Sequence, residues 1–570
     1  MEGTSYPDPC GLNFCKIKEN QRKKNVSAFA QKQLQDLQES LYTKALADAR
    51  SHFEHSSKEI RQYSERFESN LPPIFEYSSL DHVLAEIHHS PGVLFGDFHS
   101  HKQAQRGFLR LLRTYLEIFK DERMALCLEM FRSCDQHYID LFLNQKITEQ
   151  EFLAKIDYEK SWGFPWPHYA FLFEFAKNNH IPIYGLNAER AGLETLKKRD
   201  RHAAQVIKKI LHEHPQTKIF TLMGEHHLAS EHLPEFLAIE LNARKKSFVR
   251  IVANVDKYYF QLDNAKKYQA ETYLKLSQKF YCVINSSPWV KWRSHSMWEE
   301  VRRSGIINLD GWEDDDDLEF TEDEFDVEAH FLEVVKTLLK FFDIKIFDSD
   351  LSRFRITRDL AEFLTLTSSD WRDFVSRIAT KHGWYIDYGN QTIFLGVISV
   401  NNLAEAAGQF IHMMSSDQKH ERQQDLRLFF KSTVIRSTIS YLCTQILNPQ
   451  KPSIQYADLL RFIDETKGKR FVGELKQFKQ VAISIRRLVN KASNAEKNSK
   501  LYITRSDLYI EAYSSGRLSQ TLAQIIAARF HAEFVDGKTT SAELKQFIRF
   551  PHADKRSVDT QFNFCLSKLR

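Results

Sequence analysis

Between residues 80 and 290 the sequence alternates short, nearly continuous apolar runs with longer amphipathic segments. The apolar runs are VLFGDF at 93–98, MALCLEMF at 124–131, IPIYGLN at 181–187, KIFTLMG at 218–224, KSFVRIVANV at 246–255 and YCVINSS at 281–287. Strands that are apolar on both faces and alternate with helices are typical of a mainly parallel sheet covered by helices on both sides. The pattern therefore predicts an α/β fold for this part of the chain.

The flanking regions have other patterns, and with 570 residues the chain is too long for one core. We expect a polar, irregular start to about residue 24, then a long helix, which together form an N-terminal segment over 1–72. An α/β domain is expected over 73–306 and an acidic linker over 307–328, where the sequence contains EDDDD. A mostly α-helical domain is expected over 329–570, interrupted by one hairpin, WYIDYGNQTIFLG, with Gly389 and Asn390 at its turn.

Composition narrows the class of protein. Seventy-nine basic and 75 acidic residues leave a net charge of +4, which argues against nucleic acid as the main partner. The seven cysteines form no CxxC pair and fit thiols in a reducing compartment. The sequence shows no apolar signal segment, no lipobox and no apolar stretch long enough to span a bilayer, so we expect a cytoplasmic protein.

Chemically active residues gather at the ends of the predicted strands. The first strand ends in Gly96, Asp97 and His99, and the fourth in Gly224, Glu225 and His227, so two Gly-acid-X-His units end two strands alike. Because the carboxyl ends of parallel strands meet at one edge of a sheet, these residues are expected to lie close together. The other strand ends add Glu129, Asn187 and Arg190.

The residue types at this edge allow two kinds of chemistry. His99, Glu129 and His227 could form a two-histidine, one-carboxylate metal site or supply an acid and a base. Asp97 and Glu225 could orient the two imidazoles. Each residue also has an ordinary explanation, such as a hydrogen-bonded loop histidine, but together they predict a ligand pocket.

A second candidate group is aromatic. The segment SWGFPWPHYAFLF at 161–173 contains Trp162, Phe164, Trp166 and Tyr169 around two prolines. Aromatic side chains arranged in this way could cover a flat apolar ligand. Ordinary core packing explains the same pattern equally well.

The order of these motifs resembles the ChaN-like haem-binding family, within the wider Tiki, TraB and erythromycin-esterase-like superfamily. The resemblance rests on GDFHSHKQAQ, LEMF, Trp162 with Tyr169, LNAER and GEHHLASEHLPEFL, and covers residues 75–255. It implies an α/β fold with a pocket at the strand ends, a haem or iron ligand, and possible haem binding between two subunits of a homodimer. It implies Tyr169, His99 and His227 as candidate haem ligands. The family usually has Glu where this chain has Asp97.

Three functions remain open at this point. The first is a haem- or iron-binding protein, with a pocket formed by the strand-end residues, Trp162 and Tyr169. The second is a metal-dependent hydrolase that uses His99, Glu129 and His227 with a divalent metal. The third is a non-catalytic scaffold acting through the helical C-terminal region. Whether the chain is an enzyme stays open.

Overall fold

The structure of the chain is a computed structural model. It describes residues 10–53, 58–188, 195–242, 247–303, 326–347, 353–367, 369–416, 425–494, 503–514, 516–551 and 554–569. The chain forms two compact units. We call residues 41–325 the sheet unit, and residues 1–40 with 326–570 the helical unit.

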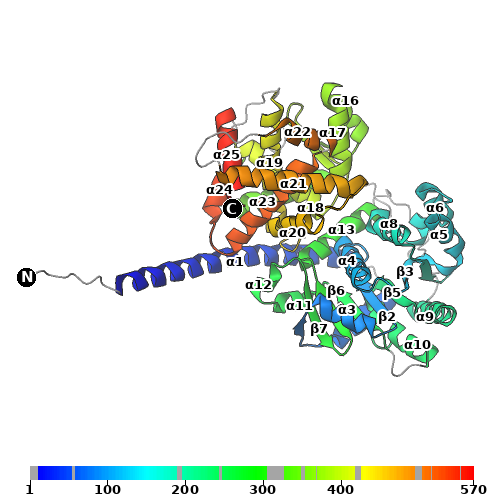
Figure 1. Ribbon diagram of the computed structural model, residues 1–570. Coiled ribbons are helices and arrows are strands. Elements are labelled where there is room, and N and C mark those ends of the chain that lie inside the picture. Colours follow the sequence, from blue (N-terminus) through cyan, green and yellow to red (C-terminus); the bar gives the residue numbers. More distant parts are fainter. Residues whose placement is uncertain are drawn as a thin grey trace, which may run out of the picture. The chain divides into compact units, whose positions relative to one another are not determined.

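An eight-stranded mixed sheet lies at the centre of the sheet unit (Figure 1). Its strands are β1 (Glu76–Ser78), β2 (Gly92–Asp97), β3 (Met124–Arg132), β4 (Ile183–Asn187), β5 (Lys218–Gly224), β6 (Val249–Ala253), β7 (Thr272–Ser277) and β8 (Phe280–Ile284). The strand order is β1-β7-β8-β6-β2-β5-β3-β4, and every pair from β8 to β4 is parallel. The predicted α/β fold with a mainly parallel sheet is confirmed.

Helices lie on both faces of this sheet. The helices of the unit are α2 (Lys58–Asn70), α3 (Leu80–His88), α4 (Lys102–Ile118), α5 (Gln136–Leu143), α6 (Glu149–Lys155), α7 (Tyr158–Ser161), α8 (Ala170–Asn179), α9 (Leu196–Glu213), α10 (Leu233–Glu240), α11 (Asp256–Gln261), α12 (Asn264–Lys267) and α13 (Pro288–Arg303). Three short 3₁₀ turns are η1 (Ser133–Asp135), η2 (Trp166–His168) and η3 (Glu225–Leu228).

Side chains that alternate along the strands build a separate core on each face. In β2, Val93 and Phe95 belong to the core that α3, α4 and α8 also form, whereas Leu94 belongs to the core that α9 and α10 form. Successive side chains of a strand point to opposite faces, so both faces of an apolar strand can be buried. The continuous apolar runs of the sequence reflect this arrangement.

Two strands and one helix start differ from the sequence expectations. The short β1 and the antiparallel β7 have no counterpart among the predicted strands. β7 has the sequence TYLKLS, whose polar residues mask its pattern, and pairing with β8 decides its conformation. Helix α1 (Cys10–Phe53) begins at Cys10, whereas the sequence predicts an irregular start to about residue 24.

The helical unit is mainly α-helical, as predicted. Its helices, after the first part of α1, are α14 (Val327–Phe342), α16 (Leu360–Leu366), α17 (Ser369–His382), α18 (Val400–Ser415), α19 (Leu426–Leu447), α20 (Tyr456–Glu465), α21 (Gly473–Asn494), α22 (Arg505–Tyr513), α23 (Arg517–Val535), α24 (Ser541–Ile548) and α25 (Lys555–Ser567).

The predicted hairpin forms from β10 (Trp384–Asp387) and β11 (Thr392–Leu395), and β9 (Arg355–Thr357) extends it to three strands. The predicted acidic linker falls almost entirely outside the described residues. None of the helices in the described ranges is long and apolar enough to cross a membrane.

Candidate functional site

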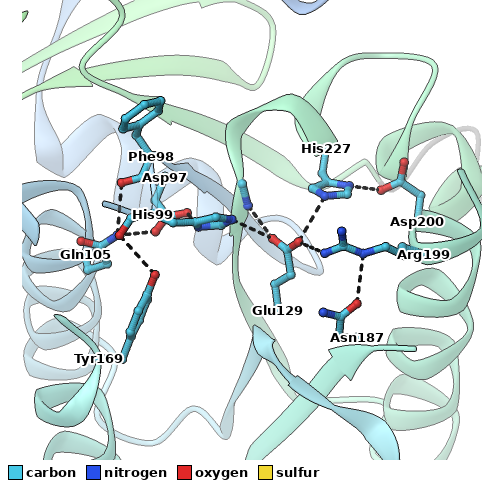
Figure 2. Close-up of polar contacts among 11 residues, drawn as sticks. Asp97, Phe98, His99, Gln105, Glu129, Tyr169, Asn187, Arg199, Asp200 and His227 are labelled. Carbon is cyan, nitrogen blue, oxygen red and sulfur yellow. Dashed lines mark hydrogen bonds and ion pairs between the residues drawn. The ribbon is translucent and has the colours of Figure 1, made fainter. Parts of the chain in front are cut away.

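The carboxyl ends of β2, β3, β4 and β5 place polar side chains side by side (Figure 2). Asp97 of β2 pairs in register with Gly224 of β5, and Leu128, the residue before Glu129 in β3, pairs with Leu222 of β5. A register shift after Leu128 then aligns the ends of β3 and β4. The prediction that these strand ends converge is therefore correct for the described residues.

The carboxylate of Glu129 is at the centre of the group. Its Oε2 accepts a hydrogen bond of 2.7 Å from the backbone N–H of Gly224, and its Oε1 accepts one from the guanidinium of Arg199. His227 Nε2 lies 3.2 Å from Oε1. Burial raises the pKa of Glu129, but His227 and Arg199 outweigh that effect and hold it well below its usual range. Glu129 is therefore a buried carboxylate whose partners favour its charged form.

His227 is clamped between two carboxylates. Its Nδ1 lies 2.6 Å from Asp200 Oδ1 of α9, and its Nε2 faces Glu129. Burial lowers the pKa of His227, but Asp200 and Glu129 together raise it to about 10. Both ring nitrogens of His227 thus face carboxylates, which leaves neither of them for a substrate proton or a metal ion.

His99 differs because it reaches the surface. Its side chain is 21% exposed, its Nδ1 lies 2.9 Å from Asp97 Oδ1, and its Nε2 is 3.7 Å from Glu129 Oε2. Asp97 itself accepts a 2.5 Å hydrogen bond from Gln105 of α4. Burial lowers the pKa of His99, and the charge of Asp97 outweighs it, so the net pKa is raised. Asp97 thus fixes one ring nitrogen of His99 and leaves the other directed at the site.

Aromatic side chains border His99. The ring centroids of Trp162 and Phe164 lie 4.6 and 5.0 Å from that of His99, and Phe164 stacks on Trp298 of α13 at 4.4 Å. Trp166, by contrast, packs among core phenylalanines, such as Phe173 at 5.3 Å. The aromatic segment therefore divides into site residues and core residues.

Tyr169 lies behind His99. It is fully buried, and its hydroxyl donates to the backbone carbonyl of His99 at 3.4 Å. Burial, together with the charge of Asp97, raises the pKa of Tyr169 well above its usual value. It supports the backbone that carries His99.

Two glycines allow the strand ends to approach. A Cβ on Gly96 would lie 2.9 Å from the Cα of Glu225, and one on Gly224 would lie 3.1 Å from Nε2 of His99. Real Cβ atoms almost never come within 3.0 Å of backbone, so Gly96 is a requirement of the packing between β2 and η3. Both glycines were singled out from the sequence, and both adjoin the polar group.

The structure changes the expected role of Glu225. The sequence suggested that Glu225 orients an imidazole, but Asp200 occupies that position beside His227. Burial raises the pKa of Glu225 to about 7, partly offset by Lys291 of α13. Glu225 thus belongs to a neighbouring buried group. Arg190, also predicted for the site, lies outside the described residues.

Arg199 and Asp200 are the residues that the sequence analysis missed. They are consecutive in α9, within KKRDRH, where charged residues suggest an ordinary solvent-facing helix. Asp200 is nevertheless fully buried, and Asn187 Oδ1 accepts a 3.0 Å hydrogen bond from Arg199 Nε. Asn187, predicted as a site residue, therefore positions the arginine that holds Glu129.

The three side chains predicted as metal ligands meet as an ion-pair network. Within the described ranges, no group of three His, Cys, Asp or Glu side chains could hold a metal ion. Both oxygens of Glu129 already have protein partners, and both ring nitrogens of His227 face carboxylates. The geometry gives the metal site no support.

Comparisons with known proteins point to the same region. Residues 83–203 match the family model described as haem-binding uptake, Tiki superfamily, ChaN. This range carries Asp97, His99, Glu129, Arg199 and Asp200 and ends before Gly224 and His227. The resemblance expected for residues 75–255 is thus confirmed over 83–203.

Among solved structures, the chain is similar to the one titled "Cofacial heme binding to ChaN of Campylobacter jejuni". The two share 15% identity over 37% of this chain and 92% of that chain, with a TM-score of 0.28. No curated protein matches the chain.

Proposed function

We propose that this protein, whose residues 83–203 are similar to the ChaN haem-binding family, binds haem at the carboxyl edge of its sheet. One observation carries the proposal: His99 is partly exposed, is oriented through Nδ1 by Asp97, and is bordered by Trp162 and Phe164. Haem supplies an iron centre within a flat apolar ring, and its iron takes a proximal histidine in many proteins.

The donor set fits this ligand. Histidines that bind metals commonly place their second ring nitrogen against a carboxylate, which fixes the tautomer and makes the free nitrogen more basic. In this chain the carboxylate is Asp97, itself held by Gln105. Aromatic rings beside the imidazole offer the apolar contact that a macrocycle needs. We therefore assign His99 as the residue that would hold the haem iron.

The other two candidate ligands fit less well. Tyr169 is buried, and its hydroxyl already donates to the carbonyl of His99. His227 has both ring nitrogens against carboxylates. We propose that Tyr169 and His227 support the site without contacting iron. The ion pairs of Glu129 with Arg199 and His227 would hold the buried residues next to His99 in place.

Titration of the purified chain with haem tests the proposal. We expect a saturable shift of the Soret band at one haem per site. His99→Ala should abolish the shift or move the band, whereas Tyr169→Phe should preserve its position, because the phenol is not a ligand. Trp162→Ala should weaken binding without moving the band, because the loss is of apolar contact alone.

Elemental analysis of the protein as purified provides the control for a bound metal. Failure of haem to shift its spectrum with the chain would refute haem binding. A shift that His99→Ala leaves unchanged while Tyr169→Phe alters it would refute the assignment of the ligand. Circular dichroism of each variant separates loss of a ligand from loss of folding.

A further inference from the structure

A basic and apolar loop stands out on the helical unit, far along the sequence from the site already described. It comprises the connection between α20 and α21 together with the first turn of α21, and it reads TKGKRFVGELK; we call residues 466–476 the basic loop. Val472 is 88% exposed and Leu475 is 54% exposed, and both are aliphatic. These two apolar side chains, three residues apart at the connection and in the first turn of α21, can serve as a contact surface.

The charges around these two side chains are mostly of one sign. Lys467, Lys469, Arg470 and Lys476 are all exposed, and among the described side chains no ion pair joins any of them to a carboxylate. The one acid of the loop, Glu474, lies 3.2 Å from Arg517 of α23. Four cations that form no ion pair with a described side chain therefore lie close in sequence to Val472 and Leu475.

The loop is held at its base and open at its tip. Lys479 of α21 donates to the backbone carbonyls of Thr466 and Lys469, the latter at 2.9 Å. Gly468 and Gly473 have positive φ angles of 76° and 60°, and a Cβ built on either would meet no described atom within 4 Å beyond the glycine and its two chain neighbours. The basic loop is thus held in a defined conformation at its base, and its two glycine turns are open to solvent.

We propose that the basic loop docks the protein on the surface of an anionic lipid bilayer. Lysine and arginine are attracted to anionic headgroups, and aliphatic side chains at the tip can enter the boundary between headgroups and acyl chains. The loop offers both at once. A single-stranded nucleic acid would instead require exposed aromatic side chains for base stacking. The aromatic residue of the loop, Phe471, is half-buried, and the ammonium of Lys479 lies 5.4 Å from its ring centroid.

Vesicle flotation with the full-length protein tests this inference. Vesicles of phosphatidylcholine with phosphatidylserine are compared with vesicles of phosphatidylcholine alone. We expect binding to the anionic vesicles only, with release at high salt, because salt screens charges at a surface. Each removed cation should weaken binding about fivefold, so Lys469→Glu with Arg470→Glu should lower it by about 25-fold or more.

A matched control separates this loop from charge in general. Lys538→Glu with Lys555→Glu makes the same change of net charge at two exposed lysines elsewhere in the helical unit, and should retain binding. Val472→Ser with Leu475→Ser should also weaken binding, while the charge stays the same. This second variant distinguishes docking through the tip from simple attraction of charges.

Three results would overturn the inference. They are no binding to anionic vesicles at low salt, equal binding by the Lys469→Glu/Arg470→Glu variant and its control, or binding of a labelled oligonucleotide in place of vesicles. Circular dichroism confirms that each variant is folded. Haem is absent from every assay, so the outcome does not depend on the proposed function.

Discussion

Buried charge is the main feature of the site at the scale of single residues. Glu129, Arg199, His227 and Asp200 form one chain of contacts in which each charge has an opposite neighbour. Burying any one of them alone would be strongly unfavourable, and removing one leaves its partner uncompensated. The network therefore makes the stability of the sheet unit depend on pH.

The sign of that dependence follows from the two pKa shifts. The pKa of His227 is raised from 6.5 to about 10, so its contribution is fully present below 6.5 and is lost as the pH rises through about 10. The pKa of Glu129 is lowered below 4.5, so its contribution is present above 4.5 and is lost as the pH falls through the folded value. Both contributions are fully present only between pH 4.5 and pH 6.5.

Asp200→Asn tests the link. At about pH 6 the variant should lose roughly 3 kcal/mol of unfolding free energy, because His227 keeps its charge with one partner fewer. Near pH 10 the difference should shrink, since His227 is then losing its proton in the wild type as well. Urea unfolding at both pH values measures this. Asp536→Asn, in an exposed pair with Lys538, is the control and should change little.

At the scale of elements, the close approach of strand ends decides the shape of the site. Gly96 faces backbone of η3, whereas Gly224 faces the movable ring of His99. The same Gly→Ala change should therefore have different consequences at the two positions. The change at Gly96 alters the packing between β2 and η3, whereas the change at Gly224 displaces the side chain of His99.

We expect Gly96→Ala to lower the free energy of unfolding by about 1–3 kcal/mol, because the strand and the 3₁₀ turn must separate. Gly224→Ala should cost less stability and should weaken haem binding, because it displaces His99 Nε2. Urea unfolding and haem titration of both variants measure the two effects. Equal losses of stability with unchanged haem affinity would contradict this assignment.

The sequence predicted the elements of the sheet better than it predicted the contacts between them. Apolar runs located β2 to β6 and β8, and the ends of these strands supplied His99, Glu129, Asn187 and His227. It did not locate Arg199 and Asp200, because burial of a charged helix turn depends on packing against distant strands. The sequence analysis also paired Glu225 with an imidazole, because Glu225 is close to His227 in the sequence whereas Asp200 is not.

At the scale of the molecule, every described residue of the proposed haem site belongs to the sheet unit. A chain of residues 41–325 should therefore bind haem with the affinity of the full-length protein. Spectral titration of both chains checks this. If the shorter chain folds by circular dichroism yet binds no haem, the helical unit must contribute to the site, and the scaffold function considered from the sequence gains support.

The position of β5 in the sheet has a consequence for biosynthesis. β5 lies between β2 and β3 and pairs with both, although it is synthesised after β3 and β4. Its last residue, Gly224, supplies the N–H to Glu129, and His227 follows in the next turn. A nascent chain on the ribosome that has emerged only to β4 lacks the strand that joins Asp97 to Glu129. The proposed ligand site is thus completed only after β5 has emerged and inserted between its two neighbours.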